Sequence, residues 1–145
     1  MSNFSEKFKE LMDERGLTAS ELAKVSGIAK SKLFNWLKYG ALPSTKSLIT
    51  AARFFGCPVD FFIGRTNEIE IVFSDKPVDF KDRLSELIEQ KKITPYRVCK
   101  ELHLETAMMT DWTRKGTLPN FDNLIMLTDY FNCSADYLLG LSEDK

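Results

Sequence analysis

Few side chains in this sequence have the chemistry of catalysis or metal binding. His103 is the only histidine, and the three cysteines, Cys57, Cys99 and Cys133, are far apart in the chain. An odd number of cysteines at such spacing fits neither a disulfide framework nor a zinc site, which predicts buried, reduced thiols. A glycine-rich phosphate loop and a nucleophile motif are also lacking. We therefore expect no enzyme activity, no cofactor and no metal.

The charged side chains divide the chain into two unlike halves. Residues 1–65 carry ten Lys and Arg against six Asp and Glu, whereas residues 66–145 carry ten against fifteen. In the basic half, Lys30, Lys32 and Lys38 occur close together. Lysines of this kind often form only a solvated helix face, but beside a nucleic acid they neutralise phosphates.

The two halves are nevertheless copies of one pattern. Residues 4–65 overlay residues 80–141 without a gap, at an offset of 76, so that Trp36 falls on Trp112. Positions that are not identical still pair apolar with apolar residues. A period this long is typical of a duplicated domain and too long for most solenoid repeats. We predict two domains and a linker, at residues 1–65, 80–145 and 66–79 respectively.

Hydrophobic spacing predicts an all-α fold with five helices in each copy. In the first copy, Gly16 ends the first helix, and Thr18 with Glu21 forms a capping box that opens the second. Ser44 is expected to cap the fourth helix, and Pro58 to occupy the first position of the fifth. The residues expected to point inward from the second and third helices are Leu22, Ala23, Val25, Leu33, Trp36 and Leu37.

The second copy repeats this plan with local changes. Thr94 caps its second helix with Pro95 at the first position, but Arg97 replaces the glutamate of the capping box. His103 takes the place of Gly27, and histidine is among the residues that tolerate a positive φ. In the linker, residues 68–73 alternate polar and apolar side chains, which predicts a partly extended segment. Two interpretations fit it: a linker laid against one bundle, or a strand that pairs with another chain.

Several motifs together resemble one family, the Cro and lambda-repressor type of helix-turn-helix proteins, also called the XRE family. The endings of the two copies, residues 54–64 and 130–140, are similar to the fifth-helix signature of its bacterial and phage members. The other matching positions in the first copy are Leu17, Thr18, Glu21, Leu22, Ala23, Gly27, Ile28, Leu33, Trp36, Leu42, Pro43, Ser44, Leu48 and Ile49. The resemblance implies two tandem five-helix lambda-repressor-like helix-turn-helix domains.

In that family the third helix lies in the DNA major groove. The resemblance implies that Lys30, Ser31, Lys32 and Asn35 read base edges, and that Ser20 and Lys38 bind phosphates. Lysine can donate to guanine, and asparagine can pair with adenine through two hydrogen bonds. Two features depart from the family. A backbone-gripping glutamine is absent at Ala19 and Pro95, and Trp36 and Gly40 are one residue further apart than is usual.

The third helix of the second copy has a different composition. Glu105 at its start would bring negative charge to phosphates or base edges. Base reading by this helix remains an alternative, since carboxylates can accept from cytosine; self-association or binding to another protein is the other. The residues that would contact DNA are Thr106, Ala107, Met108, Asp111, Arg114 and Lys115. The two tryptophans are expected in the core, and not as stacking platforms for bases.

These observations favour a sequence-specific regulator of transcription that binds double-stranded DNA, a repressor of bacterial or phage type. The alternative is an adaptor or antitoxin-like partner that keeps the fold without reading DNA. No apolar run approaches the roughly 20 residues of a membrane span, and the first residues lack signal-peptide features, which favours a cytoplasmic protein. The linker could reach roughly 46 Å, so both a homodimer and an intrachain pseudo-dimer fit half-sites about 34 Å apart.

Overall fold

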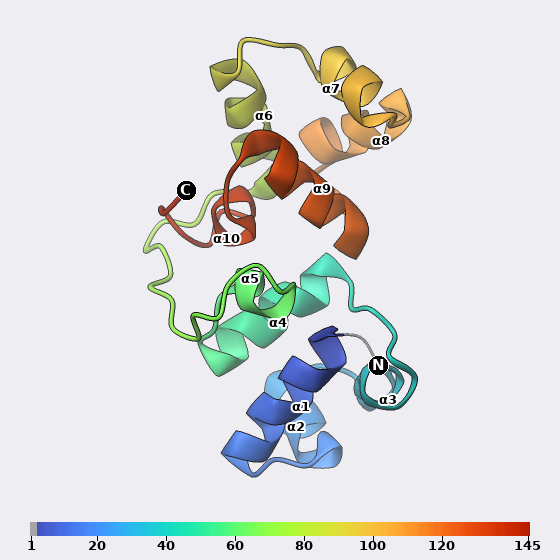
Figure 1. Ribbon diagram of the computed structural model, residues 1–145, viewed down its shortest axis with the longest axis vertical. Coiled ribbons are helices and arrows are strands. Elements are labelled where there is room, and N and C mark those ends of the chain that lie inside the picture. Colours follow the sequence, from blue (N-terminus) through green and yellow to red (C-terminus); the bar gives the residue numbers. More distant parts are fainter. Residues whose placement is uncertain (1–2) are drawn as a thin grey trace. The chain divides into compact units, whose positions relative to one another are not determined.

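The computed structural model describes residues 3–145 and contains helices without strands in that range (Figure 1). Residues 1 and 2, which belong to the first predicted domain, lie outside the described part. The chain divides into two compact units, Met1–Ile71 and Val72–Lys145. Both units consist of helices, so the predicted all-α class with two domains in tandem is confirmed.

Aromatic rings form the core of the first unit. Phe4 and Phe8 each meet the Trp36 ring edge-on, at centroid distances of 5.4 Å. Phe55 and Phe62 close the cluster, with centroids 5.5 Å and 6.2 Å from that of Phe8. Edge-to-face contacts suit the ring quadrupoles and add to the burial of the rings. The helices around this core are α1 (Asn3–Arg15), α2 (Ala19–Ser26), α3 (Lys30–Tyr39), α4 (Thr45–Phe55) and α5 (Val59–Phe62).

The helix ends of this unit follow local rules. The capping box forms, because the Glu21 amide donates to Thr18 Oγ1 at 3.2 Å and the Thr18 amide donates to the Glu21 carboxylate at 3.3 Å. Ser44 caps α4 by accepting from the Ser47 amide at 3.1 Å. Pro58 was predicted at the first helical position but is the N-cap of α5, where its extended ψ of 146° precedes the helix.

One residue predicted to point inward does not. Val25 is 62% exposed, whereas Leu22 on the same helix is fully buried. Val25 lies on the last turn of α2, about 60° around the helix axis from Leu22, and the helix ends at the next residue. No neighbouring helix therefore covers it. Ala23 and Leu37 are partly buried.

The second unit repeats the arrangement with a more aliphatic core. Leu84 and Leu138 replace Phe8 and Phe62, and Trp112 stays buried at 2% exposure. Its third helix is continuous but ends in a wider turn. The elements are α6 (Phe80–Gln90), α7 (Pro95–Leu102), α8 (Thr106–Thr110), the π-helical turn η1 (Asp111–Lys115), α9 (Phe121–Phe131) and α10 (Ala135–Leu138).

That wide turn accounts for the extra residue between tryptophan and glycine. In both units the amide of the glycine bonds to a carbonyl five residues earlier, Gly40 to Asn35 and Gly116 to Asp111. The next amide, at Ala41 or Thr117, bonds to the same carbonyl at 3.1 Å. A π-type turn absorbs one inserted residue without moving the rest of the helix. The third helix keeps its buried face despite the unusual spacing.

Backbone turns survive in the second unit where glycine has been lost. Lys92, His103 and Asn132 occupy the positions of Gly16, Gly27 and Gly56, and all three keep a positive φ, between 50° and 58°. The expectation for His103 is thus confirmed. A left-handed conformation costs a side chain with a Cβ about 1 to 2 kcal/mol, which the surrounding packing must offset.

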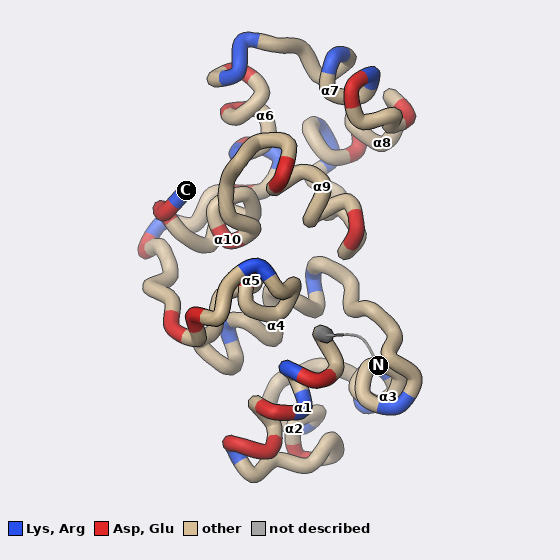
Figure 2. Tube along the Cα trace, in the orientation of Figure 1, with Lys and Arg blue, Asp and Glu red and all other residues tan. Residues whose placement is uncertain are grey.

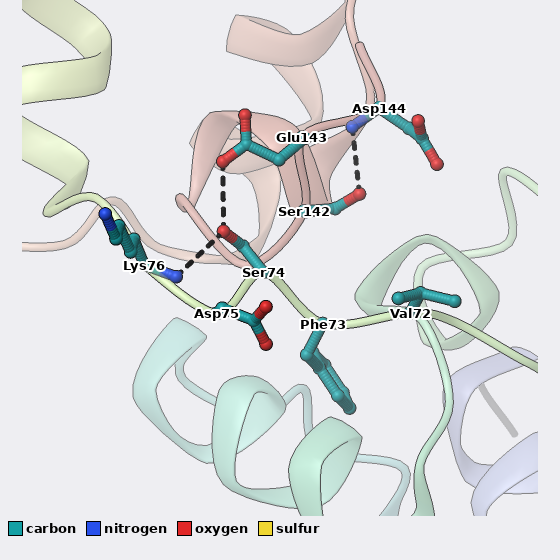
Figure 3. A pocket seen from close by; sticks show the side chains of 8 residues that line it. All are labelled: Val72, Phe73, Ser74, Asp75, Lys76, Ser142, Glu143 and Asp144. Carbon is teal, nitrogen blue, oxygen red and sulfur yellow. Dashed lines mark hydrogen bonds between the residues drawn. The ribbon is translucent and has the colours of Figure 1, made fainter.

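The predicted linker, residues 66–79, divides between the two units: residues 66–71 belong to the first and residues 72–79 to the second. The Ser74 and Val78 amides donate to the carbonyls of Leu141 and Gly140, at 2.8 Å and 3.2 Å. Ser74 Oγ also donates to the Glu143 carboxylate at 3.0 Å, as Figure 3 shows. We call residues 72–79 the strap, because they lie along the C-terminal residues of the second unit. No strand forms in residues 66–79.

Gly140 is the point at which the strap comes closest. A Cβ at this position would lie 1.7 Å from the Val78 carbonyl oxygen. Gly116 in the same unit has nearly the same φ, 77° against 76°, but a Cβ there would meet only the Lys81 side chain at 3.7 Å. Both glycines have nearly the same positive φ, but only Gly140 lies against another stretch of backbone. Comparing them therefore separates the cost of the φ from the cost of the close approach.

We predict that Gly140→Ala destabilises the second unit more than Gly116→Ala does. Gly116→Ala should cost about 1 to 2 kcal/mol from the positive φ alone. Gly140→Ala should cost at least about 2 kcal/mol more, because the strap must leave its place. Denaturant unfolding of the full chain measures both variants. Equal losses would contradict the close approach of the strap.

Candidate nucleic-acid interface

Helix α3 has one buried and one exposed face. Leu33 and Trp36 point into the unit, at 0% and 3% exposure. The exposed face carries Lys30, Ser31, Lys32, Asn35 and Lys38. The four residues predicted to read bases thus share the outer surface of one helix, together with Lys38. Ser20, the other predicted phosphate contact, is exposed on α2.

The turn before α3 fixes its direction. Gly27 ends α2 at φ 81°, and the Ile28 amide donates to Ser26 Oγ at 3.1 Å. Ile28 is buried at 5% exposure, which anchors the turn to the core. Its left-handed glycine and buried isoleucine set α3 across α2, the arrangement of a helix-turn-helix.

Trp36 holds the other end of α3. Besides its contacts with Phe4 and Phe8, its backbone carbonyl accepts a hydrogen bond from the hydroxyl of Ser5, a buried residue of α1. Burying a polar hydroxyl is tolerated when it finds such a partner. Side-chain packing and this hydrogen bond together fix α3 against α1.

The charges of the first unit are separated between its helices. Six Lys and Arg and a single acid, Glu21, lie between residues 19 and 53, whereas α1 carries four acids. Figure 2 shows the basic positions on α3 and the acidic positions on α1. Two of the three cations on α1 bond within the unit, since Lys7 donates to the Phe61 carbonyl at 2.9 Å and Arg15 to that of Phe55 at 2.8 Å. The lysines of α3 are exposed to solvent.

Two exposed aromatic residues on α3 are not among the residues predicted to contact DNA. Phe34 is 49% exposed and Tyr39 is 68% exposed. The Lys38 ammonium lies 5.1 Å from the centroid of the first ring and 5.6 Å from that of the second. A comparison of the two copies could have found them, because the first copy has rings where the second has Thr110 and Lys115.

The equivalent face of the second unit has its charges partly neutralised. Thr106, Ala107, Met108 and Arg114 are exposed and Asp111 is half-buried. Lys115 pairs with Asp111 at 3.4 Å. A depression of about 350 Å³ lies beside them, with Glu105, Asp111, Asn120 and Asn123 in its lining. This face lacks the run of lysines that marks α3.

Helix α7 carries a hydrogen-bonded network on its exposed side. Arg97 Nε donates to the Glu101 carboxylate at 2.9 Å, and the Tyr130 hydroxyl donates to its other oxygen. Burial together with this hydrogen bond raises the pKa of Tyr130 to about 12. The bonds from Tyr130 and Arg97 lower the pKa of Glu101. The charge of Arg97 is therefore held within the unit.

The cysteines lie in the cores. Cys57, Cys99 and Cys133 are buried and free. Burial raises the pKa of the Cys57 thiol, although Arg15 acts in the opposite direction. Among residues 3–145, no group of three or more His, Cys, Asp or Glu is placed to hold a metal ion. None of the helices described is long and apolar enough to cross a membrane.

Both units match families of known domains. A helix-turn-helix family matches residues 8–62, and the Cro/C1-type helix-turn-helix DNA-binding domain matches residues 83–144. Neither curated proteins nor solved structures gave a match.

We predict that Trp36→Ala destabilises the first unit by about 3 to 5 kcal/mol, because the ring fills the centre of its core. Phe34→Ala is the matched control, since it removes an exposed ring from the same helix and should change stability by less than about 0.5 kcal/mol. Thermal unfolding of the full chain, followed by circular dichroism, measures both. Equal melting of the two variants would show that the buried face of α3 is assigned wrongly.

Proposed function

Because this chain belongs to the helix-turn-helix DNA-binding proteins, with two XRE-type domains in tandem, we propose that it binds one specific duplex sequence and represses transcription, as a regulator of bacterial or phage type. The observation that carries the proposal is the exposed face of α3, where Lys30, Ser31, Lys32 and Asn35 lie together in the basic part of the first unit. Domains of this class are typical of regulators that are not enzymes.

The side chains of α3 suit the major groove. Lys30 and Lys32 are donors for the O6 and N7 atoms of guanine, and the Asn35 amide can bond adenine at N6 and N7. Ser31 can donate to, or accept from, several base edges. The four residues lie within the first two turns of α3, the end that enters the groove in a helix-turn-helix complex.

Phosphates would be bound at the rims of the same surface. Ser20 offers a hydroxyl at the start of α2, and Lys38 a cation near the end of α3. Such contacts set the register of a protein on the duplex without reading sequence. The N-cap of α3 is Ala29, whose methyl group cannot accept a hydrogen bond from the first amides of the helix. A phosphate oxygen could accept from these amides instead.

For the second unit we propose binding to a protein partner or to a second copy of the chain. Glu105 at the start of its third helix would repel phosphates, and Asp111 already pairs with Lys115. These two features favour the alternative of an adaptor or antitoxin-like partner for this unit. The first unit would then supply DNA binding on its own.

Selection of bound duplexes from a random pool tests the proposal as a whole. We expect one recurrent motif, which should be two-fold symmetric if the first units of a homodimer occupy paired half-sites, and should contain two unlike half-sites if both units of one chain read DNA. Placing that motif over a promoter should lower transcription in vitro. A pool without enrichment would contradict sequence-specific binding, and a rise in transcription would contradict repression.

We predict that Lys30→Ala and Lys32→Ala each weaken binding by about 1 to 3 kcal/mol and relax preference at one base position. Lys9→Ala is the matched control, because it removes the same charge from an exposed site on another helix, α1. Titration of the selected duplex and of single-base variants measures affinity and preference. If the three variants behave alike, the assignment of base readers is wrong.

We further predict that residues 1–71 made alone bind DNA in a salt-sensitive manner, whereas residues 72–145 bind it poorly. These boundaries keep the strap with the second unit, where its hydrogen bonds lie. For the first piece, log affinity should fall linearly with log salt, with a slope near −0.9 for each phosphate neutralised. Equal affinity of the two pieces would mean that both third helices read DNA.

A further inference from the structure

The duplicated fold shows which residues of α3 the fold does not require. Core positions stay apolar in both units, as Leu33 and Met109 do. Phe34 and Tyr39, in contrast, correspond to Thr110 and Lys115, so a large ring is dispensable at both positions. Their exposed rings therefore serve something other than folding. Exposed aromatic side chains that the fold does not need mark a contact surface.

The geometry connects both rings with one lysine. The centroids of Phe34 and Tyr39 lie 5.7 Å apart and the ring planes meet at 78°. Lys38 Nζ is 5.1 Å from the Phe34 centroid and 5.6 Å from the Tyr39 centroid, within the range of a cation–π contact. We call these two rings the aromatic clamp.

Two other cations that lie near rings in the first unit are already occupied. Lys7 lies 4.7 Å from the Phe61 centroid and Arg15 lies 5.3 Å from that of Phe55, and each donates to a backbone carbonyl. Lys38 makes no such hydrogen bond within the described residues. Its ammonium can still donate to a ligand.

A ring and a carboxylate hold a lysine in different ways. In the second unit, Asp111 holds Lys115 but cancels its charge. A ring attracts the ammonium through its quadrupole and leaves the net charge in place. A lysine held in this way has lost part of its rotamer freedom before it binds, so less entropy is lost when a phosphate is bound. The aromatic clamp therefore suits a cation that must bind an anion.

We propose that Phe34 and Tyr39 are positioning residues that hold Lys38 ready to bind a phosphate of the DNA backbone. The inference rests on the proposed function, because it assigns two further residues to the same DNA-binding surface. It adds a contact that the second unit cannot copy, since Arg114, the equivalent of Lys38, has Thr110 and Lys115 in place of the two rings.

A double-mutant cycle in the full chain tests the aromatic clamp. Phe34→Leu with Tyr39→Leu removes both rings but keeps apolar side chains, and Lys38→Met removes the cation. The ring variant should bind the selected duplex about two- to fivefold more weakly, with an unchanged salt slope. Lys38→Met should reduce the magnitude of the salt slope by about 0.9, the loss of one phosphate contact. Adding the ring changes to Lys38→Met should have no further effect.

Two controls separate positioning from other roles. Tyr39→Phe keeps the ring and removes the hydroxyl, so it should bind like the unchanged protein; a loss as large as that of the ring variant would assign the contact to the hydroxyl and overturn the proposal. In NMR spectra, the Lys38 Cε protons should lie upfield through the ring currents and return to ordinary shifts in the ring variant. Ordinary shifts in the unchanged protein would overturn it as well.

The remaining outcomes distinguish the two proposals. Additive losses in the ring variant and Lys38→Met, with salt-sensitive binding by the unchanged protein, would overturn the aromatic clamp alone. Absence of DNA binding by the unchanged protein would overturn both the clamp and the proposed function.

Discussion

The burial of one tryptophan in each unit is the constraint on which the rest of the structure depends. Trp36 is fixed by two edge-on rings and by the hydrogen bond to its carbonyl, and this leaves α3 only one rotation about its axis. With Trp36 inward, Lys30 and Lys32 must face solvent. The π-type turn at Gly40 allows an inserted residue without disturbing that rotation. Core packing, and not the lysines themselves, therefore determines which side chains are presented.

Much of the fold could be predicted because it follows from local rules. The capping box at Thr18, the cap at Ser44 and the buried positions of α3 depend on residues within one or two turns. The features that could not be predicted depend on contacts between residues that are distant in the sequence. Val25 was misplaced because its exposure depends on which helices reach the end of α2. The interpretation of the linker as laid against one bundle is confirmed for residues 72–79, but its partners beside Gly140 could not be named, because they lie more than 60 residues away.

The same limit applies to the candidate site. The exposed face of α3 was predictable from helical spacing and family resemblance, but the position of Lys38 between two rings was not, because spacing does not give side-chain rotamers. The ion pair of Asp111 with Lys115 was likewise hidden. One backbone plan therefore supports two surfaces, since the buried positions are shared and the exposed ones vary independently. The two units therefore share a backbone arrangement and differ in the charge of their exposed faces.

The strap shortens the free chain between the two units. With residues 72–79 bound along the second unit, at most residues 66–71, the end of the first unit, can act as a tether, and six residues span roughly 20 Å even when extended. A tether this short keeps a partner held by the second unit at a millimolar effective concentration near whatever the first unit binds. Under the functions proposed for the two units, a protein recruited to the second unit would be brought to the DNA bound by the first by proximity alone, without any new contact to DNA.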